Sequence, residues 1–158
     1  MYSPRWLFLY PGIALMTVGL AGCAWLLPKP ALIGTLGFDV HTLLYAFVAI
    51  VLGLQLVGFA TLTKVFAISE GLLPEDTRLN SVFRYITLEM GVAVGFVMVA
   101  LGVSGSVLAV SDWGAHNFGA LDPSRMLRIV LPSAFSLMLG VEIIFGSFFL
   151  SILQLKRR

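Results

Sequence analysis

Four long stretches of the sequence contain almost no ionisable residue, and their lengths constrain the fold more than any other feature. They are 23, 22, 22 and 27 residues long, and the last is interrupted only by Glu142. They lie between Arg5 and Lys29, His41 and Lys64, Glu89 and Asp112, and Arg128 and Lys156. A helix needs about 20 apolar residues to cross a bilayer core, so each stretch is long enough to span a membrane. The apolar residues are continuous rather than alternating, which excludes a transmembrane β-barrel.

The composition supports the same class of protein. Hydrophobic residues make up 59% of the 158 residues and charged residues 11%, against roughly 25% charged residues in an ordinary soluble domain. We therefore expect an all-α integral membrane protein, with one domain over 1–158 and four transmembrane helices arranged as two hairpins. The expected spans are about 6–27, 41–64, 88–111 and 126–154. A net charge of +2 gives no reason to expect a nucleic acid partner.

Lysine and arginine residues predict the orientation of the four spans, because cytoplasmic loops carry an excess of them. With four spans, both termini and the 64–88 connection lie on one side. That side holds seven such residues: Arg5, Lys64, Arg78, Arg84, Lys156, Arg157 and Arg158. The other side holds three: Lys29, Arg125 and Arg128. The sequence therefore predicts cytoplasmic termini.

The connections carry further signals. Asp39 and Asp122 precede the second and fourth spans, where an aspartate can accept hydrogen bonds from backbone N–H groups of the first helical turn. Pro123 suits the first helical position. Between the second and third spans, apolar residues recur at helical spacing over 73–89. Two interpretations are left open there: a short helix on the cytoplasmic membrane surface, or a loop with one helical turn.

Small residues on the last two spans predict close helix packing. Gly91 and Gly95 form a GxxxG pair, and Ser136 and Gly140 form a second pair at the same spacing. Such pairs let two backbones approach closely, either within one chain or between copies in a homo-oligomer.

Glu142 is an acidic residue inside an apolar span, which marks it as a candidate functional residue. It lies 14 residues past Arg128, about 21 Å along a helix. Gln55 lies 14 residues past His41 on a helix of the same direction, so the two should lie at similar depth. We expect either a neutral hydrogen-bonded pair that serves packing or a role in transport.

Cationic residues at the cytoplasmic boundary are the second candidate site. Lys64, Arg78 and Arg84 could bind a phosphate headgroup, or they could be ordinary positive-inside anchors. Catalytic and metal sites are not expected, because His41 and His116 lack carboxylate neighbours at metal-binding spacing. No glycine-rich phosphate loop follows a strand, and the single cysteine, Cys23, cannot form an internal disulfide. No cofactor is predicted.

Several short motifs occur in an order that resembles a known family. "SPRWLFLYPGIALM", "GFDVHTLLYA", "KVFAISEGLLP" and "LDPSRMLRIVLP" are together similar to the C-terminal membrane region of bacterial family 2 glycosyltransferases of the dolichyl- or polyprenyl-phosphate sugar synthase type. The resemblance extends over essentially the whole chain. It implies a four-helix membrane domain beside a cytoplasmic catalytic domain, which transfers a sugar from a nucleotide donor to a polyprenyl phosphate.

The catalytic domain implied by the resemblance is absent from this sequence, so no catalytic residue can be assigned. The chain is then expected to be a separately encoded membrane partner of a cytoplasmic catalytic chain, or a truncated product. The leading hypothesis is a membrane anchor that presents the lipid phosphate, in the bacterial inner membrane, with Lys64 as the favoured phosphate contact. The alternatives are a small transporter of lipid-linked sugar and a structural subunit of a membrane complex.

Overall fold

A computed structural model gives the structure of the chain and describes residues 5–33, 36–73, 88–119 and 122–155. Its long helices are α1 (Tyr10–Leu26), α2 (Val40–Ser69), α4 (Leu88–Ala115) and α5 (Pro123–Leu155), and a short π-helix, η1 (Arg5–Leu9), runs into α1. All four long helices are apolar and long enough to cross a membrane. This confirms the predicted fold class.

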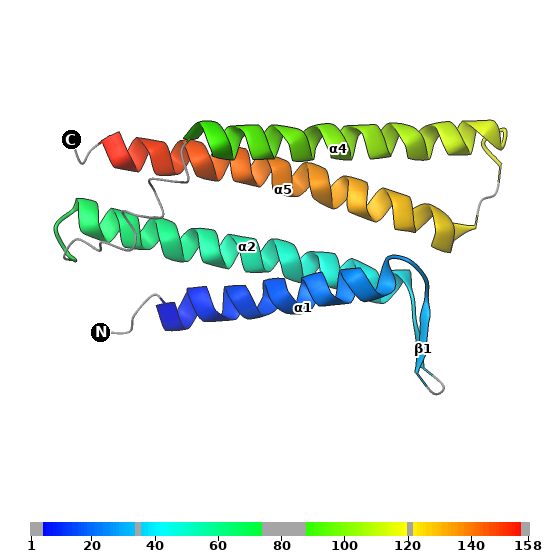
Figure 1. Cartoon of the computed structure of the whole chain (residues 1–158), viewed down its shortest axis with the longest axis horizontal. Coiled ribbons are helices and arrows are strands. Elements are labelled where there is room, and N and C mark those ends of the chain that lie inside the picture. Colours follow the sequence, from blue (N-terminus) through cyan, green and yellow to red (C-terminus); the bar gives the residue numbers. More distant parts are fainter. Residues whose placement is uncertain (1–4, 34–35, 74–87, 120–121, 156–158) are drawn as a thin grey trace.

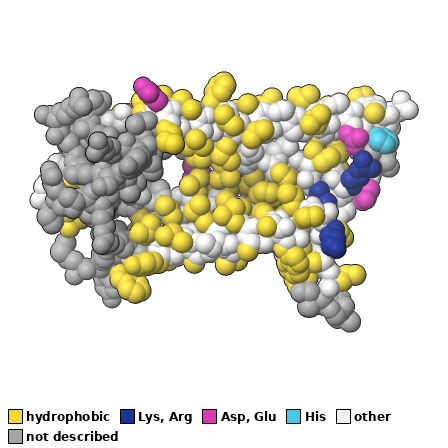
Figure 2. All heavy atoms as spheres, in the orientation of Figure 1, with side chains coloured by type: hydrophobic (Ala, Val, Ile, Leu, Met, Phe, Trp, Pro, Cys, Tyr) yellow, Lys and Arg dark blue, Asp and Glu magenta, His cyan; other side chains and the backbone are white. Residues whose placement is uncertain are grey.

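The helices form two antiparallel hairpins that lie side by side (Figure 1). α1 packs against α2, α4 packs against α5, and α2 joins the two hairpins by packing against α5. We call the end of the bundle where α1 begins and α5 ends the terminal end, and the opposite end the hairpin end. Hydrophobic side chains are spread along the described helices on the face drawn in Figure 2, and most of the charged side chains that it colours gather at the hairpin end.

A small β-hairpin at the hairpin end was not expected from the sequence. β1 (Ala31–Ile33) pairs antiparallel with β2 (Leu36–Phe38), and Ala31 lies opposite Phe38. The Phe38 ring lies 5.9 Å from the ring of Trp25 at the end of α1. Strands of three residues are too short to produce a recognisable alternating pattern, so this element could not be predicted from periodicity.

The second span continues beyond its expected end. α2 extends past Lys64 to Ser69, and Glu70 and then Gly71, which has a φ of +71°, follow its end. The N–H of Gly71 donates to the carbonyl of Ile68, and the N–H of Leu72 donates to the carbonyl of Ala67. These two bonds form a Schellman motif, which requires a residue in the left-handed region and favours glycine there. Most of the segment 73–89, for which a surface helix and a loop with one helical turn were both expected, falls on 74–87, outside the described residues.

Glycine residues bring α4 and α5 into backbone contact. A Cβ atom added to Gly140 would lie 2.6 Å from the carbonyl oxygen of Gly95 and 2.8 Å from the backbone nitrogen of Val99. The Ser136 hydroxyl donates a 2.8 Å hydrogen bond across the same interface to the carbonyl of Met98. The small residues predicted from the sequence therefore pack within the chain. Gly91 and Gly95 are buried within the chain, and a homo-oligomer stays a prediction.

Glycine residues also bring the backbones of α1 and α2 into close contact in the first hairpin, at positions that the sequence analysis did not predict. An added Cβ on Gly12 of α1 would lie 2.9 Å from the carbonyl oxygen of Gly53 on α2. One on Gly19 would lie 2.6 Å from the carbonyl oxygen of Ala46. Because lipid tails are as apolar as leucine, helices in a membrane gain little by hiding apolar surface, and close packing supplies much of the attraction instead.

Larger apolar side chains join the two hairpins. Cys23, Leu26, Leu43 and Ile50 form a buried cluster between α1 and α2, and two partly buried leucines of α5 pack against it: Leu131 and Leu139. Beside this cluster the ring of Phe47 stacks on the ring of Phe135, with centroids 5.0 Å apart. α5 therefore contacts the first hairpin through large apolar side chains, whereas its contact with α4 also includes the small residues Ser136 and Gly140.

We expect Gly140→Ala to lower the free energy of unfolding by about 1–3 kcal/mol, because the new methyl group would collide with backbone atoms that cannot rotate away. Gly146→Ala is a matched control on the same helix, since a Cβ there meets no atom within 4 Å. Unfolding in mixed micelles with increasing dodecyl sulfate measures both. Equal effects of the two substitutions would contradict the packing explanation.

Candidate functional site

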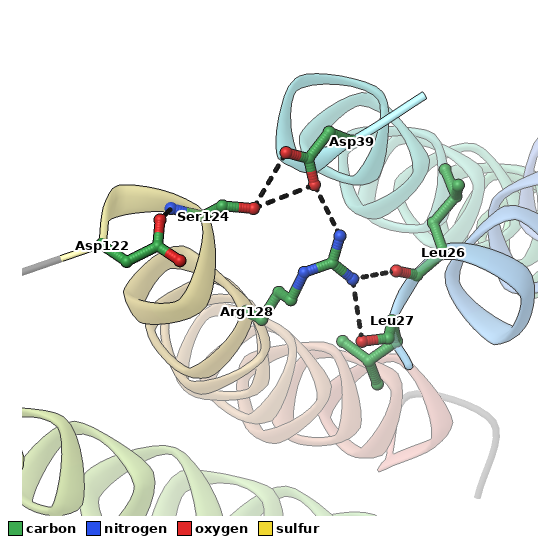
Figure 3. A network of polar contacts seen from close by, with 6 residues as sticks. All are labelled: Leu26, Leu27, Asp39, Asp122, Ser124 and Arg128. Carbon is green, nitrogen blue, oxygen red and sulfur yellow. Dashed lines mark hydrogen bonds and ion pairs between the residues drawn. The ribbon is translucent and has the colours of Figure 1, made fainter. Parts of the chain in front are cut away.

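Asp39 occupies the position before α2 but does not play the capping role expected for it. Its backbone is extended, and its carboxylate makes no capping hydrogen bond to the first turn of α2. The carboxylate instead accepts hydrogen bonds from the Ser124 hydroxyl, at 2.8 and 3.1 Å, and from Nη2 of Arg128, at 2.5 Å (Figure 3). The expected cap was wrong because α5 brings a cation and a hydroxyl group to this carboxylate.

Arg128 joins three helices at once. While its Nη2 donates to Asp39, directly before α2, its Nη1 donates to the carbonyl oxygens of Leu26 and Leu27 at the end of α1 (Figure 3). The last carbonyl groups of a helix have no partner within the helix and carry partial negative charge, which favours a cation there. Only 14% of the Arg128 side chain is exposed. We call Asp39, Ser124 and Arg128 the polar clamp.

The start of α5 positions the clamp residues. The backbone N–H of Ser124 donates a 3.1 Å hydrogen bond to Oδ1 of Asp122, and Pro123 is the first residue of the helix. The predicted capping role of Asp122 is thereby confirmed. Ser124 and Arg128 are four residues apart and so project from one side of α5. From the sequence, Arg128 was counted only among the Lys and Arg residues that predict the orientation of the spans. Nothing in its neighbourhood along the chain indicates a partner 89 positions away.

The clamp favours the ionised form of Asp39. The hydrogen bond from Ser124 is the largest influence that holds the pKa of the Asp39 carboxyl below its ordinary value of 3.8. The Arg128 guanidinium acts in the same direction, against the opposing effect of burial.

Glu142 lies on the face of α5 that is turned towards the first hairpin, because it follows Phe135 by two helical turns. Its side chain is half-buried, and its Oε2 atom is buried without a hydrogen-bond partner in the part of the chain that the structure describes. Gln55 is exposed on α2. No hydrogen bond from Gln55 reaches that oxygen, so the pair stays a prediction.

The candidate phosphate site is described only in part. Lys64 is half-buried in the last turns of α2, at the terminal end of the bundle. Arg78 and Arg84 lie outside the described residues, so the grouping of the three cations stays a prediction. Within the described ranges, no three His, Cys, Asp or Glu residues gather in a way that could hold a metal ion.

A double-mutant cycle should show that Asp39 and Arg128 stabilise the fold as a pair. We expect Asp39→Asn and Arg128→Gln each to lower the free energy of unfolding, with a coupling energy of about 1–2 kcal/mol. This lies below the effect of a fully buried pair, because the Asp39 side chain is 38% exposed. Arg125→Gln, on the exposed side of the same helical turn, is the control and should change little. Additive effects of the two clamp substitutions would rule out the pairing.

The lowered pKa of Asp39 predicts a loss of stability in acid. The folded state favours the ionised carboxyl, so its contribution is complete above the ordinary pKa of 3.8 and is lost as the pH falls through the lower folded value. Unfolding midpoints measured from pH 6 down to pH 2 should therefore fall more steeply below pH 4 in the wild type than in Asp39→Asn. Parallel curves over that range would contradict the assignment.

Comparison with known proteins identifies the class of membrane domain. The family described as glycosyltransferase family 2 C-terminal transmembrane region matches residues 61–154. A curated relative, the low-salt glycan biosynthesis hexosyltransferase Agl6 of Haloferax volcanii, is 27% identical over 151 residues. The alignment covers 94% of this chain but 35% of the relative, so the chain spans about a third of that protein's length. No solved structure matches the chain.

The family match covers α4, nearly all of α5 and the last turns of α2, including Lys64 and Glu142. It agrees with the resemblance that the motifs indicated and with the four membrane-spanning helices. The chain belongs to the glycosyltransferase family 2 C-terminal transmembrane region family.

Proposed function

We propose that this chain is the membrane anchor of a family 2 glycosyltransferase and that it presents a polyprenyl phosphate to the catalytic part. The observation that carries the proposal is the family match over 61–154. The relative of which the chain covers about a third is a hexosyltransferase by name. The catalytic part would act on a lipid phosphate at the membrane surface, and the four helices would hold it there.

The terminal end of the bundle is the surface that suits this role. α1 begins there and α5 ends there, and Lys64 lies there near the end of α2. A cationic side chain at a membrane interface attracts an anionic lipid headgroup by about 1 kcal/mol. We propose that this end faces the cytoplasm, with Lys64 contacting the lipid phosphate and Arg78 and Arg84 adding positive charge. The plasma membrane is the location that follows from this orientation.

The proposal requires a catalytic part to contact the terminal end. Native mass spectrometry of the protein, released gently from its own membrane, tests this directly. A co-released glycosyltransferase catalytic chain or a bound polyprenyl phosphate would support the proposal. A protein that carries neither, or that is released only with other membrane subunits, would reject it in favour of a structural role.

The role of Lys64 predicts a specific loss of lipid binding. Lys64→Gln should weaken binding of polyprenyl phosphate by about fivefold, the equivalent of about 1 kcal/mol. Lys29→Gln is the matched control, because Lys29 follows α1 at the opposite end of the bundle. Titration of labelled polyprenyl phosphate into nanodiscs that contain each variant measures the affinities. Equal affinities of the two variants would remove Lys64 from the site.

A further inference from the structure

Gln55 is a polar residue at the middle of a membrane-spanning helix. α2 runs from Val40 to Ser69, and Gln55 lies half-way along it with an exposed side chain. The surroundings of an exposed side chain at the middle of such a span are hydrocarbon. A carboxamide has two N–H donors and a carbonyl acceptor, and hydrocarbon satisfies none of them. The position of Gln55 therefore favours a polar contact from outside the chain.

The exposed residues around Gln55 form a stripe along α2. Tyr45 is 72% exposed, Leu52 46% and Phe59 54%. The four residues are separated by seven, three and four positions, and residues at these spacings share one face of a helix. We call Tyr45, Leu52, Gln55 and Phe59 the Gln55 stripe. The ring of Phe59 also contacts the ring of Phe8 in η1, with centroids 4.9 Å apart, and this contact marks the end of the stripe.

The Gln55 stripe is accessible to another membrane helix. In the row of helices in Figure 1, α2 lies between α1 and α5 and packs against both. The stripe consists of the residues of α2 that these two contacts leave exposed, so it belongs to a broad face of the row. Apolar residues at alternating spacings of three and four are typical of helices that pack side by side along a seam.

A second copy of the chain matches the stripe in polarity and in depth. Two copies have the same orientation in a membrane, so a two-fold axis that relates them is parallel to the membrane normal. Equal residues then lie at equal depth, and Gln55 of one copy lies level with Gln55 of the other. A carboxamide is self-complementary, because each side chain can donate an N–H to the carbonyl oxygen of the other.

We propose that the Gln55 stripe is the contact surface for a second copy of this chain, in a parallel dimer with hydrogen bonds between the two Gln55 side chains. The apolar residues of the stripe pack on both sides of this polar pair. A single polar residue in an apolar seam fixes the register of the two helices, because any shift along the seam separates the amides. The inference uses α2 alone, so it does not depend on the proposed function.

Förster transfer between donor-labelled and acceptor-labelled copies in phosphatidylcholine vesicles tests the dimer. We expect transfer that falls as the lipid-to-protein ratio rises. Gln55→Leu should raise the dimer dissociation constant by about tenfold, since hydrogen bonds between membrane helices contribute about 1–2 kcal/mol in model peptides. Gln55→Asn is the matched control, because it keeps the donors and the acceptor and should retain most of the association.

Gln55→Leu replaces an exposed side chain, so it should leave the free energy of unfolding of the single chain unchanged. An equal dissociation constant for the wild type and Gln55→Leu would overturn the proposal. A chain that stays monomeric at every lipid ratio would also overturn it, in favour of a contact of Gln55 within the chain.

Disulfide cross-linking identifies the face that the two copies share. Cys23 is the single cysteine and is buried, so Cys23→Ala provides a cysteine-free background. Leu52→Cys should form a cross-linked dimer in vesicles, because the two-fold axis brings equal residues of the stripe together. Leu101→Cys is the control, since Leu101 is 63% exposed on α4. Cross-linking through Leu101→Cys but not through Leu52→Cys would show a different interface and reject the Gln55 stripe.

Discussion

In a bilayer there is no water to satisfy the backbone, so every N–H and C=O group in the hydrocarbon core must find its partner within the protein. Each long helix meets this requirement by itself, and the arrangement of the helices then depends on weaker forces. Apolar side chains gain little by leaving lipid for another helix, so attraction comes from close backbone contact and from polar bonds between helices. Close backbone contact and polar bonds between helices occur in different parts of this bundle.

Within each hairpin the helices are held by glycine residues that let the backbones touch. Gly12 meets Gly53 in the first hairpin, and Gly95 meets Gly140 in the second. Between the hairpins the contact is made by larger side chains and by Arg128, whose guanidinium reaches α2 and the end of α1. The bundle therefore consists of two tightly packed pairs joined by a contact with a charged group at one end.

The number, type and pairing of the helices could be predicted because charge is excluded from the membrane interior. The spacing of ionisable residues indicates where each span begins and ends, and this does not depend on which helices pack together. The clamp could not be predicted, because Asp39 has the sequence signature of a helix cap and its actual partner is brought to it only by the tertiary fold. Counting residues along a helix places Gln55 and Glu142 at similar depth, but the direction of a side chain around the helix depends on which face is packed. Their pairing therefore stays a prediction.

The position of Arg128 has a mechanical consequence for the whole bundle. Its bonds to Asp39 and to the end of α1 fix the two hairpins to each other at one end, where water and headgroups can solvate the charges. Further along the two helices, a Cβ atom added to Gly58 of α2 or to Gly146 of α5 would meet no atom within 4 Å. Moving the two hairpins apart sideways therefore costs the least free energy at the terminal end, beyond the aromatic pair, while the Arg128 guanidinium keeps them together at the hairpin end. Lipid that enters between the hairpins would do so from the half of the membrane nearer to the terminal end.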